Sequence, residues 1–233
     1  MIIVGIETST HLGSIAISDE ETDRTRILGR ISISLSASRS EKLIPYIDFL
    51  LDEIGIDFSD IDLIAVSIGP GSFTGLRVSL ATAKGLAFSS GIPLIGIDSL
   101  MCCAFPFLSN NEKVGAFFDA KRGEVYGAAY NLSSQRGFPN IIIEPSIFHA
   151  YDFLNTLIEN KIYFVTGDDT LSSYSKFFID NKINHPNSVN YFPDALSISR
   201  LGYLSYKKGL YNSSYLHSPQ YLREFIPGNP NGR

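Results

Sequence analysis

The first apolar run of the chain, IIVGI, ends in an acidic residue that three hydroxyl side chains follow: Glu7, Thr8, Ser9 and Thr10. A carboxylate at the end of a strand can hold a metal-bound water beside a nucleotide, and neighbouring hydroxyls can contact its phosphates. The same residue types also satisfy the backbone of a tight hairpin, because short polar side chains bond to nearby N–H groups. The spacing leaves both interpretations open.

A glycine-rich loop follows a later apolar run, in the stretch SIGPGSFTGLRVSLATAKGLA of residues 67–87. It is not a Walker loop, because three residues separate Gly71 from Gly75 where four are needed, and Leu76 stands where a lysine is required. Backbone N–H groups from Phe73 to Gly75 could still bind an anion at the start of the predicted helix.

The same loop has an interpretation without a ligand. Gly75, Ser79 and Ala83 recur every four residues and form a stripe of small side chains on one face of a helix. Such a stripe lets another segment of backbone approach closely, as the flanking Gly69 and Gly71 would. Spacing alone favours close packing over phosphate binding.

The remaining reactive side chains exclude several kinds of enzyme. The four histidines, His11, His149, His185 and His217, are scattered, with no pair one helical turn apart, so zinc hydrolysis is disfavoured. Ser72 lacks the glycine two residues earlier that a nucleophile elbow needs. Cys102 and Cys103 are adjacent, which predicts buried, reduced thiols. No catalytic group and no metal site are predicted.

The elements that must position these residues repeat along the chain. The pattern predicts three strands, a helix, a strand and a helix, then a strand over PLIGID, residues 93–98. KVGAFFDAKRGEVYGAAYNL begins the same order again, with Asp119 where Glu7 was. A strand, a helix, a strand, a helix over about 171–181 and a last helix after Pro193 follow. Two related halves, 1–100 and 101–233, are therefore predicted.

The first predicted helix raises a question about its apolar side chains. Ser38 and Glu41 could form a capping box, but Pro45 would then kink the helix, so a later start is expected. Its apolar residues cover a wide arc: Leu43, Ile47, Leu50 and Ile54 trace one stripe, while Ile44 and Leu51 diverge from it. The arc could be core or an exposed patch.

The charge and composition of the chain limit the kinds of partner that it could bind. The chain has 233 residues with a net charge of −5 and no long basic run, so another protein would have to supply most contacts to any RNA. The N-terminus has no basic region before its apolar run, and no stretch approaches the ~18 apolar residues that cross a bilayer. A cytoplasmic protein without a membrane segment is expected.

Several stretches together resemble one family, the bacterial TsaB (YeaZ) proteins. They are the strand-acid-turn-strand opening and its repeat, GPGSFTGLR, LIGIDSL, DAKRGEVY and the closing PQYLRE. The resemblance implies an α/β fold of two lobes, of the actin-like, sugar-kinase and Hsp70 class (a duplicated ribonuclease H-like fold), with a reduced second lobe. Glu7 stands where ATPases of this class usually have Asp, and Ser9 where they have Gly, which counts against autonomous nucleotide hydrolysis.

The resemblance also implies a function. It implies a non-catalytic subunit that binds and activates TsaD, with TsaE, for threonylcarbamoyl transfer to the adenosine next to the tRNA anticodon. The subunit would reach tRNA only through the complex and would form a homodimer when TsaD is absent. The alternative is a small actin-fold ATPase or kinase that acts alone through Glu7 and the loop at Gly71.

Two sets of residues follow from the resemblance. No cofactor would be tightly bound, although ATP or ADP could bind at the junction with TsaD. Residues that could contact this nucleotide are Glu7, Thr8, Ser9, Gly69, Gly71, Ser72, Phe73, Thr74, Gly75 and Arg77. Residues expected to bind the partner protein are Leu43, Ile44, Ile47, Leu51, Ser79 and Ala83.

Overall fold

The first half of the chain forms a five-stranded sheet. A computed structural model describes residues 1–34, 42–132, 137–186, 192–210, 218 and 222. The strands are β1 (Ile2–Glu7), β2 (Leu12–Glu20), β3 (Thr25–Ser34), β4 (Leu63–Gly69) and β5 (Leu94–Asp98), in the order β3-β2-β1-β4-β5. β1, β2 and β3 are antiparallel, whereas β4 pairs with β1 and β5 in parallel. The predicted element order is confirmed.

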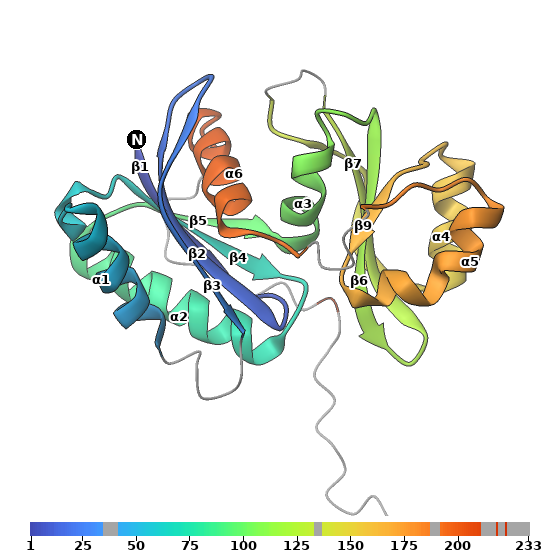
Figure 1. Cartoon of the computed structure of the whole chain (residues 1–233), viewed down its shortest axis with the longest axis horizontal. Helices are drawn as coiled ribbons and strands as arrows, with labels where there is room; N and C mark the ends of the chain where they lie inside the picture. Colours follow the sequence, from blue (N-terminus) through green and yellow to red (C-terminus); the bar gives the residue numbers. More distant parts are fainter. Residues whose placement is uncertain (35–41, 133–136, 187–191, 211–217, 219–221, 223–233) are drawn as a thin grey trace, which may run out of the picture.

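Helices cover both faces of this sheet (Figure 1). α1 (Leu43–Ile54) and α2 (Phe73–Ser90) lie side by side on one face, and α6 (Ala195–Lys207) packs on the other. β1 shows why two faces are needed, because its side chains alternate: Val4 and Ile6 pack under α1 and α2, while Ile3 packs in the core on the α6 side. A short turn, η2 (Phe58–Asp60), precedes β4.

The second half repeats the sheet with one strand fewer among the described residues. Its strands β6 (Lys113–Lys121), β7 (Glu124–Asn131), β8 (Asn140–His149) and β9 (Val165–Gly167) lie in the order β8-β7-β6-β9, with β9 parallel to β6. α4 (Ala150–Glu159), η4 (Asp169–Tyr174) and α5 (Ser175–Asp180) cover its outer face. The helix expected over about 171–181 is therefore a 3-10 turn followed by a short α-helix.

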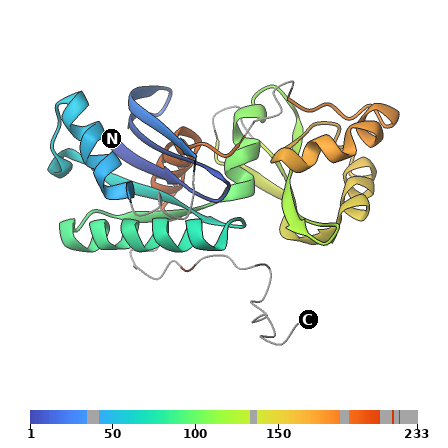
Figure 2. The same cartoon turned by 60° about the horizontal axis from the view of Figure 1, so that its bottom comes forward.

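The space between the two sheets is filled by α3 (Ser99–Ala104), η3 (Phe105–Phe107) and α6. We call the first sheet with its helices the first lobe and the second sheet with its helices the second lobe (Figure 2). α3 was not predicted. Cys102 and Cys103 are buried free thiols in it, as expected.

Three sequence predictions need comment. The division into lobes 1–100 and 101–233 stays a prediction, except that it is wrong to place α6 in the second lobe. α6 packs against β1, β2, β4 and β5 of the first sheet. α1 begins at Leu43, so Pro45 lies in its first turn and the later start is confirmed. Ser38 and Glu41 lie outside the described residues. Within the described ranges, no helix is both long and apolar enough to cross a membrane.

Candidate functional site

The glycine-rich loop packs directly on the first hairpin. Gly71 has φ +153°, and a Cβ there would lie 2.2 Å from the carbonyl oxygen of Ser9. The Ser72 N–H donates to that same oxygen at 2.6 Å. A Cβ at Gly75 would lie 2.2 Å from the carbonyl oxygen of Thr8. Only glycine allows these approaches, so the interpretation of the loop as a close-packing device is confirmed.

Thr8 ties the hairpin to α2 through its side chain and backbone. Its Oγ1 lies 3.0 Å from the carbonyl oxygen of Gly75 and 2.7 Å from Ser79 Oγ, and its N–H donates to Ser67 Oγ at 3.3 Å. Ser79 and Ala83 are fully buried. The stripe of small residues therefore packs against the chain's own hairpin, and the expectation that Ser79 and Ala83 form an exposed partner surface is wrong.

The start of α2 is capped by its own chain. The Ser72 side chain accepts from the Gly75 N–H at 3.3 Å, which uses one of the donors that an anion would need. Gly69 is buried at the end of β4, while Phe73 and Thr74 are exposed at the first turn. The Arg77 guanidinium stacks 3.6 Å from the centre of the Phe73 ring. This end of α2 is organised for packing rather than opened toward a phosphate.

Glu7 is buried behind the hairpin. Its side chain has no exposed surface, and its Oε1 accepts from the Ser9 N–H at 2.5 Å. Its Oε2 has no hydrogen-bond partner among the described residues. Burial raises the pKa of Glu7 to about 7, against the lowering effect of the bonds from Ser9 and Ser67. The carboxyl group is therefore part-protonated near neutral pH.

The second hairpin presents its acid to solvent. Asp119 accepts from the backbone N–H of Lys121 at 2.7 Å and from its Nζ at 2.6 Å. The Asp119 N–H donates to Asp168 Oδ2 at 3.0 Å. Asp168 follows β9 directly, and the sequence analysis did not identify it. The position of an acid just after the parallel strand next to β6 could have indicated it.

A cleft of about 280 Å³ separates the two hairpins. Ser9, Gly71 and Ser72 are the predicted site residues that line it, whereas Glu7 and Gly75 lie behind its wall. The full lining is Ser9, Thr10, His11, Gly71, Ser72, Phe118, Asp119, Ala120, Lys121, Tyr126 and Asp168.

The cleft is poorly equipped for phosphate chemistry. Its one lysine, Lys121, is paired with Asp119, and Asp168 adds a second carboxylate. Its volume lies just below the ~300 to 1,000 Å³ of most ligand pockets. The described parts of the chain hold no group of three or more metal-ligating side chains.

The outer face of α1 and α2 carries exposed apolar side chains, but they differ from those predicted. Leu43, Ile47 and Leu51 are buried core residues under α1, so only Ile44, which is 55% exposed, remains of the α1 residues expected to bind a partner. The arc is mainly core. Phe88, at the end of α2, is 75% exposed.

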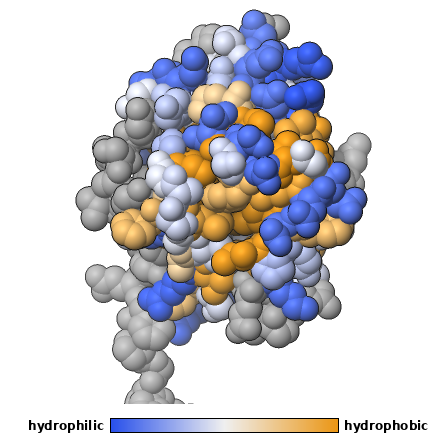
Figure 3. Space-filling view, turned by 90° about the vertical axis from the view of Figure 1, so that its left-hand side faces the viewer, coloured by the Kyte–Doolittle hydropathy of each residue, from blue (hydrophilic) through white to orange (hydrophobic). Residues whose placement is uncertain are grey.

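α2 has a second small stripe, which faces outward. Ala81 and Gly85 are exposed, and a Cβ at Gly85 would meet nothing within 4 Å. Ile27 of β3 and Phe49 of α1 are also exposed. Figure 3 shows apolar surface gathered on the face at the α1 end of the molecule, with hydrophilic residues around it. We call Ile44, Ala81, Gly85 and Phe88 the α1–α2 face.

The duplicated sheets define the class of protein. A 3-2-1-4-5 strand order repeated as 3-2-1-4, with an acid at the end of each first strand, is the arrangement of two-lobed proteins of the actin-like, sugar-kinase and Hsp70 class. The second lobe is reduced, since the described residues give it four strands.

Comparisons with known proteins agree with this assignment. The family model described as "TsaD: tRNA N6-adenosine threonylcarbamoyltransferase" matches residues 27–162, more than half of the chain. The tRNA threonylcarbamoyladenosine biosynthesis protein TsaB of Haemophilus influenzae is 34% identical over 97% of this chain and 95% of its own length. The protein of the same name from Escherichia coli is 30% identical over 64% of this chain and 65% of its own length. The structure of YeaZ from Pseudomonas aeruginosa superposes with a TM-score of 0.72 and 22% identity, over 94% of this chain and 99% of that one.

The chain belongs to the TsaB (YeaZ) family, which is related in sequence to TsaD. The match to the Escherichia coli protein spans just under two thirds of that protein's length.

Proposed function

We propose that this chain is a non-catalytic subunit of tRNA threonylcarbamoyladenosine synthesis, which binds and activates TsaD together with TsaE. In this role it acts in the cytoplasm and reaches tRNA only through the complex. The observation that carries the proposal is the α1–α2 face: two helices that lie side by side expose the apolar side chains of Ile44 and Phe88, and α2 also exposes the small residues Ala81 and Gly85. A partner helix can approach such a stripe closely while Ile44 and Phe88 provide apolar contact.

The same face would make the free protein a homodimer. Because TsaD and a second copy of this chain would bind the same face, they could not bind at the same time, and TsaD would compete with self-association. A stable contact of ordinary size buries about 1,200 to 2,000 Å² in total, and a C2 dimer would supply that area from the same residues twice. The dimer would then be a storage form that TsaD dissociates.

Co-purification with TsaD from the same genome, followed by threonylcarbamoylation of tRNA with and without this chain, tests the function. The expected result is that modification requires this chain as well as TsaD and TsaE. Full modification in its absence would contradict the proposal.

Charge substitutions test the surface separately from the fold. Ile44→Glu and Phe88→Glu should each weaken both the homodimer and TsaD capture by about 10-fold or more, because a carboxylate would be buried without a partner. Ile179→Glu is the matched control, since Ile179 is 78% exposed on α5 of the second lobe. Normal dimerisation and capture by folded Ile44→Glu and Phe88→Glu variants would exclude this face.

We also propose that the chain alone holds no tightly bound cofactor and that ATP or ADP binds at the junction with TsaD. Ser9, Gly71 and Ser72 face the cleft and would contact that nucleotide. The complete burial of Glu7 behind the cleft and the capped start of α2 argue against Mg-nucleotide chemistry by this chain alone. Sustained ATP turnover by the purified chain, well above that of a Glu7→Ala variant, would instead support the alternative of a small ATPase or kinase.

A further inference from the structure

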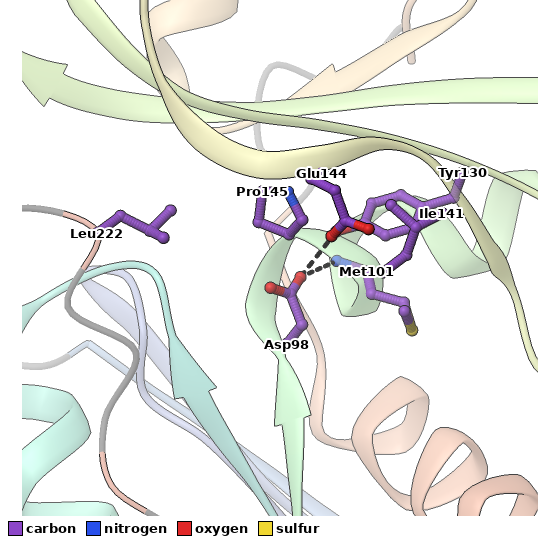
Figure 4. Close-up of a pocket in the computed structure, with 7 residues that line it drawn as sticks. All are labelled: Asp98, Met101, Tyr130, Ile141, Glu144, Pro145 and Leu222. Atoms are coloured by element: carbon purple, nitrogen blue, oxygen red, sulfur yellow. Dashed lines mark hydrogen bonds between the residues drawn. The ribbon is translucent and has the colours of Figure 1, made fainter.

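A second pocket, separate from the cleft, lies where the end of β5 meets β7 and β8. It has a volume of about 370 Å³ and shares no lining residue with the cleft. Figure 4 shows Asp98 rising from the end of β5 toward Tyr130 and Glu144, with Leu222 on the far side of the pocket. Its lining is Asp98, Met101, Tyr130, Ile141, Glu144, Pro145 and Leu222.

One carboxylate oxygen of Asp98 accepts two hydrogen bonds, from α3 and from β7. Its Oδ1 accepts from the Met101 N–H at 2.7 Å, which caps α3, and from the Tyr130 hydroxyl at 2.8 Å. Tyr130 has no exposed surface, so this bond satisfies its buried hydroxyl. The other oxygen, Oδ2, is buried and has no hydrogen-bond partner among the described residues. In Figure 4 it points away from both bonds, into the pocket.

An unpartnered carboxylate oxygen in such a place is costly unless a donor reaches it. Burial raises the pKa of Asp98 to about 6, the bonds from Met101 and Tyr130 oppose this effect, and the charge of Glu144 adds to it. Among the described residues that line the pocket there is no lysine, arginine or histidine. These lining residues therefore supply two carboxylates and no positive charge.

The remaining walls of the pocket are apolar. Met101, Ile141 and Pro145 line it beside the carboxylates. A divalent ion would need about six oxygen ligands, which two carboxylates and apolar walls do not offer. A phosphate would be repelled. The chemistry that matches is a planar cation with several N–H donors on an apolar stem.

We propose that this pocket binds a guanidinium group, with Asp98 Oδ2 and Glu144 as its acceptors. The volume, near the low end for ligand pockets, suits one arginine side chain rather than a nucleotide. The group has two available sources. One is an arginine outside the chain, and the other is Arg223, which follows the lining residue Leu222 in the sequence and lies outside the described residues.

The test follows the Asp98 carboxyl carbon by NMR in the full chain, with N-acetylarginine amide as the probe. If the source is external, the wild-type protein should bind the probe with a Kd of about 1 mM or tighter, and the pKa of Asp98 should fall by about one unit. The apolar analogue N-acetylnorvaline amide should have no effect. Glu144→Gln should weaken probe binding about 3- to 10-fold, whereas Glu159→Gln, a change of an exposed carboxylate on α4, should leave it unaltered.

The Arg223→Gln variant distinguishes the second source. If Arg223 occupies the pocket, the NMR signal of Asp98 in the wild type should not change when the probe is added. Arg223→Gln should then raise the pKa of Asp98 and allow the probe to bind. Asp98→Asn, which retains an acceptor for the Met101 and Tyr130 bonds, should abolish probe binding in either background without unfolding the chain. Absence of any probe response in both the wild type and Arg223→Gln would overturn the proposal.

Discussion

Each lobe has an acidic residue near the end of the first strand of its sheet, but the surroundings of the two acids differ. Glu7 ends β1 and is fully buried, and burial raises its pKa to about 7. Asp119 lies near the end of β6, about one third exposed, and bonds to Lys121 lower its pKa although partial burial acts against them. A repeated topology therefore does not repeat the chemistry.

The difference comes from what covers each hairpin. In the first lobe, Gly71 of the loop before α2 contacts Ser9, and Gly75 in the first turn of α2 contacts Thr8. From the other side of the sheet, the Ala195 N–H donates to Ser14 Oγ at 2.9 Å. In the second lobe, a Cβ at Gly123 in the hairpin turn would meet nothing within 4 Å. The first hairpin is a structural junction, and the second is a wall of the cleft.

Removing the close approach at Gly75 should have the largest effect on stability. Gly75→Ala places a Cβ against the backbone oxygen of Thr8, which cannot move without shifting the hairpin, so the free energy of unfolding should fall by about 3 kcal/mol. Gly85→Ala, on the outward side of the same helix, should raise it by about 0.5 to 1 kcal/mol. Urea denaturation of both variants measures the two values.

Changes of opposite sign in the unfolding free energy of these two variants would confirm that the inner face of α2 contacts the hairpin backbone and that the outer face is open. A Gly75→Ala variant as stable as Gly85→Ala would show that the hairpin and the loop are not tightly joined.

Glu7 should give the first lobe a pH dependence that is larger than that of Asp119 in the second lobe and opposite in sign. Its folded pKa of about 7 is above the ordinary glutamate value of 4.5, so its contribution to stability is full below about pH 4.5 and is lost as pH rises through about 7. The shift corresponds to about 3 kcal/mol as an upper bound. Glu7→Gln should therefore match the wild type near pH 4 and gain relative stability of up to about 2 to 3 kcal/mol by pH 8.

Chemical denaturation of Glu7→Gln and the wild type at pH 4, 6 and 8 provides the measurement. A difference in unfolding free energy that does not change with pH would mean that Glu7 ionises normally and that the hairpin admits water.

The sequence predicted the elements better than it predicted their exposed faces. Alternation and helical spacing identified the strands and the longer helices of both lobes, because periodicity reports that a face is apolar, but they missed the short α3. It does not report whether the chain or a partner covers that face. Leu43 and Leu51 are core residues, and so is Ala83, because α1 and α2 pack on the sheet and on each other, while Gly75 and Ser79 contact Thr8.

The sites depended even more on contacts that are remote in sequence. Asp98 and Tyr130 are 32 positions apart, and Asp119 and Asp168 are 49 apart. Asp119 and Asp168 meet because β6 and β9 are parallel neighbours, whereas Asp98 and Tyr130 meet where the end of β5 in the first sheet reaches β7 of the second sheet, so no local motif marks either pair. The glycine-rich loop was the exception, since its spacing alone favoured packing over phosphate binding.

The hydroxyl bond between Thr8 and Ser79 should contribute less than the glycine contact. Thr8→Val and Ser79→Ala each leave a buried polar atom without this partner and should cost about 1 to 2 kcal/mol. The double variant should cost less than the sum, by about 0.5 to 1 kcal/mol, because the bond is lost only once. A strictly additive result from the thermodynamic cycle would contradict the direct bond.

The smallest effect is expected at the acid of the second lobe, and its sign opposes that of Glu7. Because the folded pKa of Asp119 is lowered, its contribution to stability is present above its unfolded pKa, near 4, and is lost as pH falls through the folded value. Asp119→Asn should therefore cost a few tenths of a kcal/mol at pH 7, where the exposed pair with Lys121 is screened, and nothing near pH 2. Lys121→Met should cost less still, since the backbone N–H of residue 121 continues to bond to Asp119. Both variants are measured beside Glu7→Gln over the same pH range. An Asp119→Asn curve that gains stability with rising pH, as Glu7→Gln should, would mean that the second hairpin buries its acid after all and that the two lobes are alike.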